Sequence, residues 1–234
     1  MLNTAILLKI QERLNKLASA DYDNIEPWQS IEAFNKGMSD WTRRNLHGLN
    51  VVKEGDEQST RRIDDFQCLL EPMNMIMSNK GTYYETNDLP ANYMQWKRIS
   101  CNASNDCCPG KRSMRIYPAE EGNIDVIMAD LNKKPSFEWA ETFATIAGNK
   151  VKIFTDGEFV VEDAVLIYYR QPRRIQMAGV QDPYTGVAAP LEIISEFKDD
   201  INELLVDEAV KILSGDIEAG NQMQREAQSV ESNN

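Results

Sequence analysis

Apolar side chains near the start of the chain recur every three to four residues, as they do along one face of a helix. Ile6, Ile10 and Leu14 lie on this face, and Asn3 or Thr4 precedes it with a side-chain oxygen that can cap the first turn. The pattern therefore predicts a helix at the beginning of the chain.

A second helical pattern begins at Pro27, because the fixed φ of proline suits the first turn of a helix. Phe34 and Met38 lie along its apolar stripe, which continues almost to the next glycine in the chain. The pattern predicts a helix from Pro27 to His47.

A third amphipathic pattern runs from Ser59 to Leu70, with small hydroxyl residues at its start that can cap a helix. Pro72 is expected to end this helix, because proline has no backbone donor for the next turn. Residues 1–72 are therefore expected to be a helical part.

From Met73 onward the period of the pattern changes to two, which is the period of a β-strand. Met73, Met75 and Met77 fall on one side, and Asn79-Lys80-Gly81 can then turn the chain into Thr82–Thr86. These residues predict a β-hairpin.

Further strand-like segments follow, separated by Gly, Pro or Asp. They are Ser113–Tyr117, Ser136–Ile146, Lys150–Thr155, Phe159–Val161 and Ala164–Arg170. Asp156-Gly157 is the strongest signal for a hairpin turn, because glycine accepts the positive φ that tight turns require. Short strands with local turns favour an antiparallel meander, expected over residues 73–187.

The last periodic stretch of the chain is helical again. Its apolar positions are Ile201, Leu204, Leu205, Ala209, Ile212 and Leu213. Gly215 is expected to end this helix as its C-cap. We expect residues 188–234 to be a C-terminal helix that packs with the N-terminal helices, followed by an acidic tail that is either a frayed helix or disordered.

Taken together, these patterns predict an α+β fold with a helical part made by both ends of the chain and an antiparallel β part in the middle. Its longest apolar run, Ala164–Tyr169, is far shorter than the ~20 residues that span a bilayer, so no membrane segment is expected.

The charge of the chain is strongly acidic. Lys and Arg number 25 against 37 Asp and Glu, which gives a net charge of -12, and residues 189–234 alone hold 11 acids and 3 bases. Duplex DNA is itself densely negative, so a conventional DNA-binding function is disfavoured. Solubility is an equally good explanation of the excess acid.

Motifs of common enzyme classes are missing. No two of the 12 glycines stand two or four positions apart, which excludes the dinucleotide fingerprint and the serine nucleophile elbow. His47 is the only histidine, and it can simply cap the end of its helix. We assign no catalytic, cofactor-binding or metal residue, and we expect that the chain is not an enzyme.

Three of the four cysteines, Cys101, Cys107 and Cys108, fall in a stretch of polar residues that reads as a loop. Their spacing lacks the paired Cys-x2-Cys unit of zinc sites. Two alternatives stay open: a zinc-stabilised protein-binding module that uses these thiols, and a small thiol hydrolase that combines one of them with His47.

Basic residues gather at three places despite the acidic total. These are Arg61-Arg62, then Lys97-Arg98 with Lys111, Arg112 and Arg115, and finally Arg170, Arg173 and Arg174. Each group can bind phosphate, or it can pair with the acidic C-terminal helix of a neighbouring copy. Because both signs of charge are segregated along one chain, we favour self-association.

Four stretches of the chain resemble neck proteins of tailed bacteriophages, especially those of the crAss-like group. They are Ser59–Phe66 (STRRIDDF), Leu89–Met94 (LPANYM), Ile167–Pro172 (IYYRQP) and Leu204–Val210 (LLVDEAV). At Asn92 the chain departs from the resemblance, which would lead us to expect an acid there.

This resemblance implies a subunit of a roughly twelvefold ring between the portal and the tail, with helices around the axis and β elements that reach neighbours. Its partners would be copies of itself, the portal protein and other neck or tail proteins. DNA would pass through the ring without specific binding. The location would be the virion neck, after assembly in the host cytoplasm.

Overall fold

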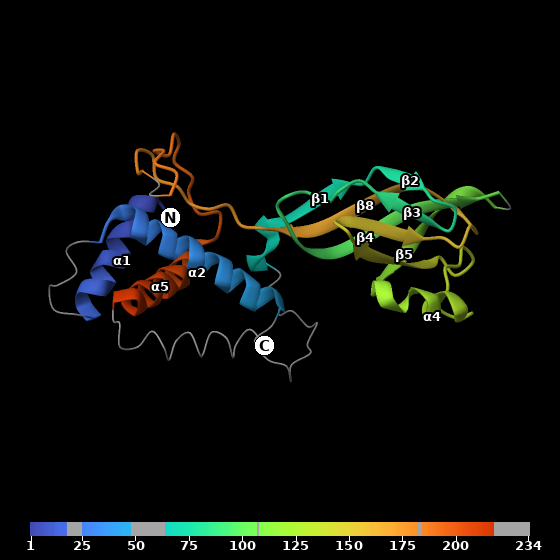
Figure 1. Cartoon of the computed structure of the whole chain (residues 1–234), viewed down its shortest axis with the longest axis horizontal. Helices are drawn as coiled ribbons and strands as arrows, with labels where there is room; N and C mark the ends of the chain where they lie inside the picture. Colours follow the sequence, from blue (N-terminus) through green and yellow to red (C-terminus); the bar gives the residue numbers. More distant parts are fainter. Residues whose placement is uncertain (18–24, 48–63, 107, 182–183, 218–234) are drawn as a thin grey trace. The chain divides into compact units, whose positions relative to one another are not determined.

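The computed structural model describes residues 1–17, 25–47, 64–106, 108–181 and 184–217. The chain divides into two compact units, Met1–Cys68 with Pro172–Asn234 and Leu69–Gln171, which we call the helical unit and the sheet unit (Figure 1). The predicted α+β class is confirmed. Residues 172–187, which we had expected in the β part, belong to the helical unit.

The helical unit is built from both ends of the chain. It contains α1 (Asn3–Leu17), α2 (Pro27–His47) and α5 (Asp199–Ile217). The predictions for the first two helices are confirmed, and α5 packs against both. Ile10, Phe34 and Leu205 are fully buried in this unit. In the described ranges, no helix combines the length and the apolar character needed to cross a bilayer.

Glycine allows α2 and α5 to approach closely. A Cβ atom placed on Gly37 would lie 3.3 Å from the Cβ of Glu208 and 3.6 Å from the backbone nitrogen of Ala209. Gly215, by contrast, was wrongly predicted to cap α5: it is buried within the helix, which continues to Ile217. Packing of the helix outweighs the preference of glycine for a helix end.

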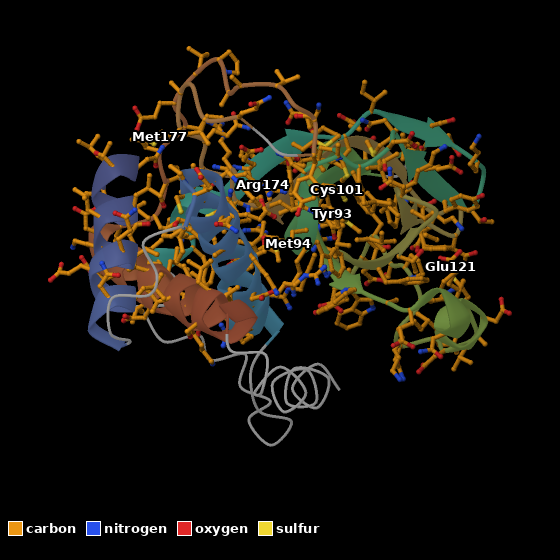
Figure 2. All side chains as sticks on the ribbon, turned by 60° about the vertical axis from the view of Figure 1, so that its left-hand side comes forward. Tyr93, Met94, Cys101, Glu121, Arg174 and Met177 are labelled. Carbon is orange, nitrogen blue, oxygen red and sulfur yellow. The ribbon has the colours of Figure 1, made fainter. Side chains whose placement is uncertain are left out.

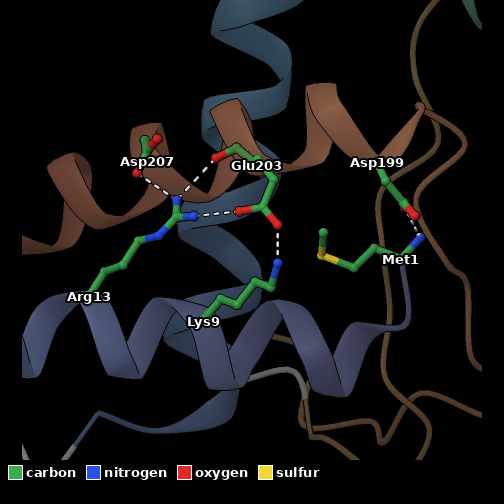
Figure 3. A network of polar contacts seen from close by, with 6 residues as sticks. All are labelled: Met1, Lys9, Arg13, Asp199, Glu203 and Asp207. Atoms are coloured by element: carbon green, nitrogen blue, oxygen red, sulfur yellow. Dashed lines mark hydrogen bonds and ion pairs between the residues drawn. The ribbon is translucent and has the colours of Figure 1, made fainter.

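A charged network joins α1 to α5 (Figure 3). Lys9 and Arg13 both bind the carboxylate of Glu203, and Arg13 also reaches Asp207 at 2.5 Å. The hydrogen bond from Lys9, assisted by Arg13, lowers the pKa of Glu203 below its ordinary value, although partial burial opposes the shift. These acids of α5 are therefore paired within their own unit.

Residues 175–181 and 184–194 form an irregular antiparallel segment before α5, which we call the arm. Isolated bridges join its two sides at Gln176–Ile193 and Gln181–Ala188. Asn35 binds both backbone groups of Ile175, at 2.8 and 3.2 Å. Asn3 donates to the carbonyl oxygens of Gln176 and Ile193, at 2.9 and 3.0 Å. Two buried asparagines thus hold the base of the arm on the helices.

The sheet unit is one eight-stranded sheet. Its strands are β1 (Leu70–Asn74), β2 (Met77–Asn79), β3 (Tyr83–Thr86), β4 (Tyr93–Asn105), β5 (Cys108–Pro118), β6 (Glu141–Ala147), β7 (Lys150–Phe154) and β8 (Val160–Arg170). Their order in the sheet is β1-β8-β4-β5-β6-β7-β3-β2. All pairs are antiparallel except β5–β6, which are parallel. The crossover between these two strands carries η2 (Glu121–Asn123) and α4 (Ile124–Ala129).

The strand order corrects the predicted meander. Three consecutive pairs, β2–β3, β4–β5 and β6–β7, are local antiparallel pairs, but β8 inserts between β1 and β4. Asp156 and Gly157 do have positive φ, at 52° and 71°. The hairpin predicted around them is nevertheless wrong, because β7 pairs with β3 and β6 while β8 pairs elsewhere.

The end of the predicted third helix is corrected. Residues 59–63 lie outside the described residues, Asp64 and Asp65 are helical, Gln67–Leu69 form a 3-10 turn, and Leu70 already begins β1. Pro72 lies inside β1, which is an edge strand of the sheet. Proline is tolerated there because the open side of an edge strand needs no donor.

The other strand predictions hold only in part. The hairpin is confirmed for β2 and β3, whereas Met73 belongs to the separate strand β1. The strand that we expected to begin at Ser136 begins at Glu141 instead. Phe159 precedes a single long strand, β8, where we had expected two segments.

Leucine at position 37 tests the crossing of α2 and α5. We expect Gly37→Leu to destabilise the helical unit by about 1–3 kcal/mol through overpacking, which exceeds the ~1 kcal/mol that leucine gains in helix propensity. Amide hydrogen exchange on α2 and α5 measures the effect. Gly122→Leu is the matched control, since no atom lies within 4 Å of its added Cβ, and should change stability by less than about 0.5 kcal/mol. Equal effects of the two changes would contradict the close approach.

The network at Glu203 should appear in the pH dependence of stability. A carboxylate whose pKa is lowered on folding contributes stability above its unfolded pKa of about 4.3, and this contribution is lost as the pH falls through the folded value. Because solvent screens the network, Glu203→Gln should cost only about 1 kcal/mol at neutral pH. Denaturation curves should show that the cost disappears in acid. A cost that is independent of pH would rule out the ion pairs as its cause.

Candidate interaction site on the sheet unit

The cysteines do not form the polar loop that we predicted. Cys101 lies in β4 with 2% of its surface exposed, among the core residues of the sheet (Figure 2). Burial, with a smaller effect of the Asp163 charge, raises the pKa of Cys101 to about 12. Its thiol therefore stays protonated at neutral pH, which suits neither a nucleophile nor a zinc ligand.

Of the other residues considered for chemistry, Cys107 lies outside the described residues and Cys108 begins β5. His47 is the last residue of α2, in the other unit. Among the side chains that the structure describes, no three His, Cys, Asp or Glu residues are grouped so that they could hold a metal ion.

Most of the basic residues singled out in the sequence have partners in the same unit. Arg170, with 8% of its side chain exposed, binds Glu71 at 2.8 Å. Arg174 pairs with Glu32. Lys111 pairs at 2.5 Å with Glu162 on β8. The pair Arg61-Arg62 falls outside the described residues. Arg170, Arg174 and Lys111 therefore do not need a neighbouring copy as a partner for their charge.

Arg98 and Arg115 are different, because both line a hollow of 640 Å³ on the sheet unit. Ile99 in β4 and Met114 in β5 are buried in the core, so the alternation of a strand turns Arg98 and Arg115 to the opposite, outer face. Trp139 completes the rim from the segment before β6. We call this surface the Trp139 hollow.

Trp139 is held in an exposed position by the backbone beside it. Its side chain is 76% exposed, whereas nearby Phe137 is buried against Phe159. Ala140 has φ of 55°, a left-handed conformation that is unfavourable for alanine. The carbonyl oxygen of Ala140 accepts a hydrogen bond from the amide of Arg115 at 2.7 Å, which fixes this turn onto β5.

The electrostatics of the Trp139 hollow are mainly positive. Arg115 donates to the hydroxyl of Tyr117 at 3.2 Å, and this hydroxyl donates to Glu141 at 3.0 Å. The bond to Tyr117 and the charge of Glu141 raise the pKa of Arg115 above its ordinary value. No carboxylate in the described part of the chain forms an ion pair with Arg98. Arg115 also forms an ion pair with Glu141 at 3.5 Å, so Arg98, Arg115 and Glu141 together carry a net charge of +1.

The composition of the Trp139 hollow is typical of a protein-binding surface. Tryptophan and arginine are the residues that most often dominate binding energy in protein interfaces. The hollow has no nucleophile paired with a general base, which hydrolysis would need. The group Lys97-Arg98 with Arg115 was the part of this site that the sequence indicated. Nothing in the sequence indicated that Trp139 would be exposed beside it.

Two of the four stretches that carry the phage resemblance meet inside the sheet unit. Tyr93 is opposite Arg170 in the β4–β8 register, and the carbonyl oxygen of Asn92 accepts from the amide of Gln171 at 2.7 Å. The hydroxyl of Tyr168 lies 3.1 Å from Glu71 and 3.2 Å from the side-chain oxygen of Asn92. These stretches therefore serve the scaffold of the sheet rather than an exposed site.

Asparagine at position 92 suits this cluster better than an acid would. An acid there would put a second carboxylate beside Tyr168 and Glu71, and like charges at such distances repel. Burial and the bond to Glu71 already raise the pKa of Tyr168 above its ordinary value. Asparagine accepts the same hydrogen bond without adding charge.

Comparison with known proteins returns no match, neither among protein-family models nor among curated proteins.

A pair of neighbouring aromatic residues tests whether the Trp139 hollow is a surface feature. Trp139→Ala should change the free energy of unfolding by less than about 1 kcal/mol, because the ring is already in water. Phe137→Ala, the matched core change, should cost about 3–5 kcal/mol. Chemical denaturation measures both. A large cost of Trp139→Ala would mean that this ring supports the fold.

Proposed function

We propose that this protein is a structural subunit of an oligomeric ring in the neck of a tailed phage, between the portal and the tail. The resemblance of four stretches to neck proteins, spread from Ser59 to Val210, supports this role. Partners would be further copies of the chain, the portal protein and adjacent neck or tail proteins. We propose no reaction for it.

The observation that carries this proposal is the division of charge between the two units. The sheet unit holds 14 acidic and 11 basic residues, for a net charge of -3, and the helical unit holds 23 and 14, for -9. The Trp139 hollow adds a local positive surface to the nearly neutral unit. One chain thus presents two chemically different surfaces.

Two different surfaces are what a closed ring requires. A ring of identical subunits repeats one heterologous interface, in which one patch of each copy contacts a different patch of the next. A symmetric dimer, in contrast, uses the same patch twice. The copy number of about twelve comes from the phage resemblance.

The acidity of the helical unit suits a wall around a DNA channel. A basic wall would gain free energy from the release of counterions and would hold the duplex, whereas an acidic wall repels it and lets it slide. This is the reason to place the helices, rather than the sheet, nearest the axis of the ring.

The two alternatives from the sequence have less support. Both the zinc-stabilised module and the thiol hydrolase were based on the group of thiols that includes Cys101. This residue is buried, and its pKa of about 12 disfavours the thiolate that both functions use. No observation favours either alternative over the ring subunit.

Binding of duplex DNA to the purified chain tests the channel model. We expect weak binding even at low salt, measured by fluorescence anisotropy of a labelled duplex, because a net charge of -12 opposes association. A variant with the exposed acids Glu26, Asp40 and Glu192 changed to Lys is the control, and it should bind the duplex more tightly. Submicromolar binding by the unchanged chain in ~0.15 M salt would contradict the proposal.

Electron microscopy of phage particles that carry the tagged chain tests its location. Density for the chain in a ring between portal and tail is the expected result. Density elsewhere in the virion, or none, would overturn the assignment to the neck.

A further inference from the structure

We propose that the arm of one copy binds in the Trp139 hollow of the next copy. This inference rests on the proposed ring, and it names the two surfaces that form the repeated interface. Its support comes from the exposure, the charge and the rigidity of both surfaces.

The arm exposes an unusual amount of apolar surface. Its large apolar side chains in water are Tyr184 at 82%, Leu191 at 72%, Val187 at 65% and Ile194 at 51% exposure. Single exposed apolar residues are ordinary, but a group on one short segment indicates a binding surface. Among the described residues, none of these four side chains belongs to the buried core.

The backbone of the arm is held in a defined conformation on the helices. Asn35 and Asn3 bind its backbone close to both ends, and the two isolated β-bridges fix the distance between its two sides. A segment already ordered in the free subunit loses little conformational entropy when it binds. A binding element of this kind can reach a neighbour without first folding on it.

The charge of the arm complements that of the hollow. Residues 175–194 of the sequence contain two acids, Asp182 and Glu192, and no Lys or Arg, and Glu192, an exposed acid, directly follows Leu191. On the other side, Arg98 and Arg115 line the hollow together with Trp139. An apolar residue next to a carboxylate therefore meets an aromatic ring next to two guanidinium groups.

The size of the hollow fits a few side chains. Its volume of 640 Å³ lies within the range of about 300–1,000 Å³ for sites that enclose compact ligands. Ile99 and Met114 are buried on the core side of the sheet, so Trp139 is the large apolar side chain that the hollow exposes. Leu191 can pack against this ring while Glu192 stays at the charged rim.

A single-stranded nucleic acid is the other class of ligand that a tryptophan and two arginines can bind, by stacking and by phosphate contacts. The observations favour the arm, because Glu141 stands at the lining and the whole chain carries -12. The two ligands are distinguished by the test below.

Photocrosslinking from the arm provides the test. A benzophenone amino acid replaces Leu191 in the full chain, which is mixed at high concentration with an equal amount of isotope-labelled chain that lacks the probe. Mass spectrometry should identify crosslinks between copies that map to the lining of the Trp139 hollow, residues 139–141 among them.

Charge reversal supplies the specificity control. Arg98→Glu in the labelled chain should lower the yield of these crosslinks about tenfold, and Glu192→Arg in the probe chain should restore part of it. Lys80→Glu, an exposed change elsewhere on the sheet unit, should leave the yield unchanged. An added single-stranded oligonucleotide should not compete.

The inference is overturned if crosslinks map elsewhere, join residues of one copy only, or fail to form. It is equally overturned if the oligonucleotide displaces the arm, which would make nucleic acid the ligand. Failure of the ring proposal looks different. If particles contain the ring but the chains do not form these crosslinks, only the proposed interface is wrong. If the chains form these crosslinks but are absent from the neck of the particle, only the assigned location is wrong.

Discussion

The packing of the last helix against the first two is the contact on which the rest of this chain depends. Val206 and Ala209 of α5 are buried, and α5 packs against helices that are about 160 to 205 residues away in the sequence. The chain between them must therefore leave the helical unit and return to it. The sheet meets this requirement by pairing its first strand with its last: Leu70 of β1 is opposite Tyr169 of β8.

The same constraint explains where the buried charge lies. Arg170 is nearly the last residue of the sheet unit, and Glu71 is nearly the first. Their ion pair crosses the two strands next to the points where the chain enters and leaves the unit. Arg170 is buried while Glu71 is more than a third exposed, so the pair contributes little net stability, but losing Glu71 would leave a buried guanidinium without its carboxylate. The pair therefore favours this register of β1 and β8 over a shifted one.

The sequence predicted the long helices well and the pairing of strands poorly. The apolar faces and the first turns of α1 and α2 are local features, so a short stretch of sequence is enough to predict each helix. Strand pairing is decided by a shared core, so the turn residues Asp156-Gly157 are present without the hairpin they suggest. The strand β4 was hidden by polar neighbours, although Ile99, Cys101 and Ala103 alternate as core residues do. A similar ambiguity affected Leu69 and Leu70, which fit a helical stripe equally well.

The candidate site was only half visible in the sequence for a related reason. The basic groups could be found by composition, but the partner that neutralises Arg170 is about a hundred positions away and appears only when the sheet is formed. Nothing in the sequence distinguished Trp139. Its exposure follows from the left-handed backbone of Ala140, which no pattern of hydrophobic residues reveals.

The adjacency of β1 and β8 has a consequence for how such a chain can change over evolutionary time. Paired residues of neighbouring antiparallel strands lie only about 5 Å apart, so both connections of the sheet unit leave from almost one point. A unit attached in this way has the geometry of an insertion into a surface loop of the helical unit. A different domain whose two ends lie side by side could occupy the same place in the chain without changing the packing of the three helices.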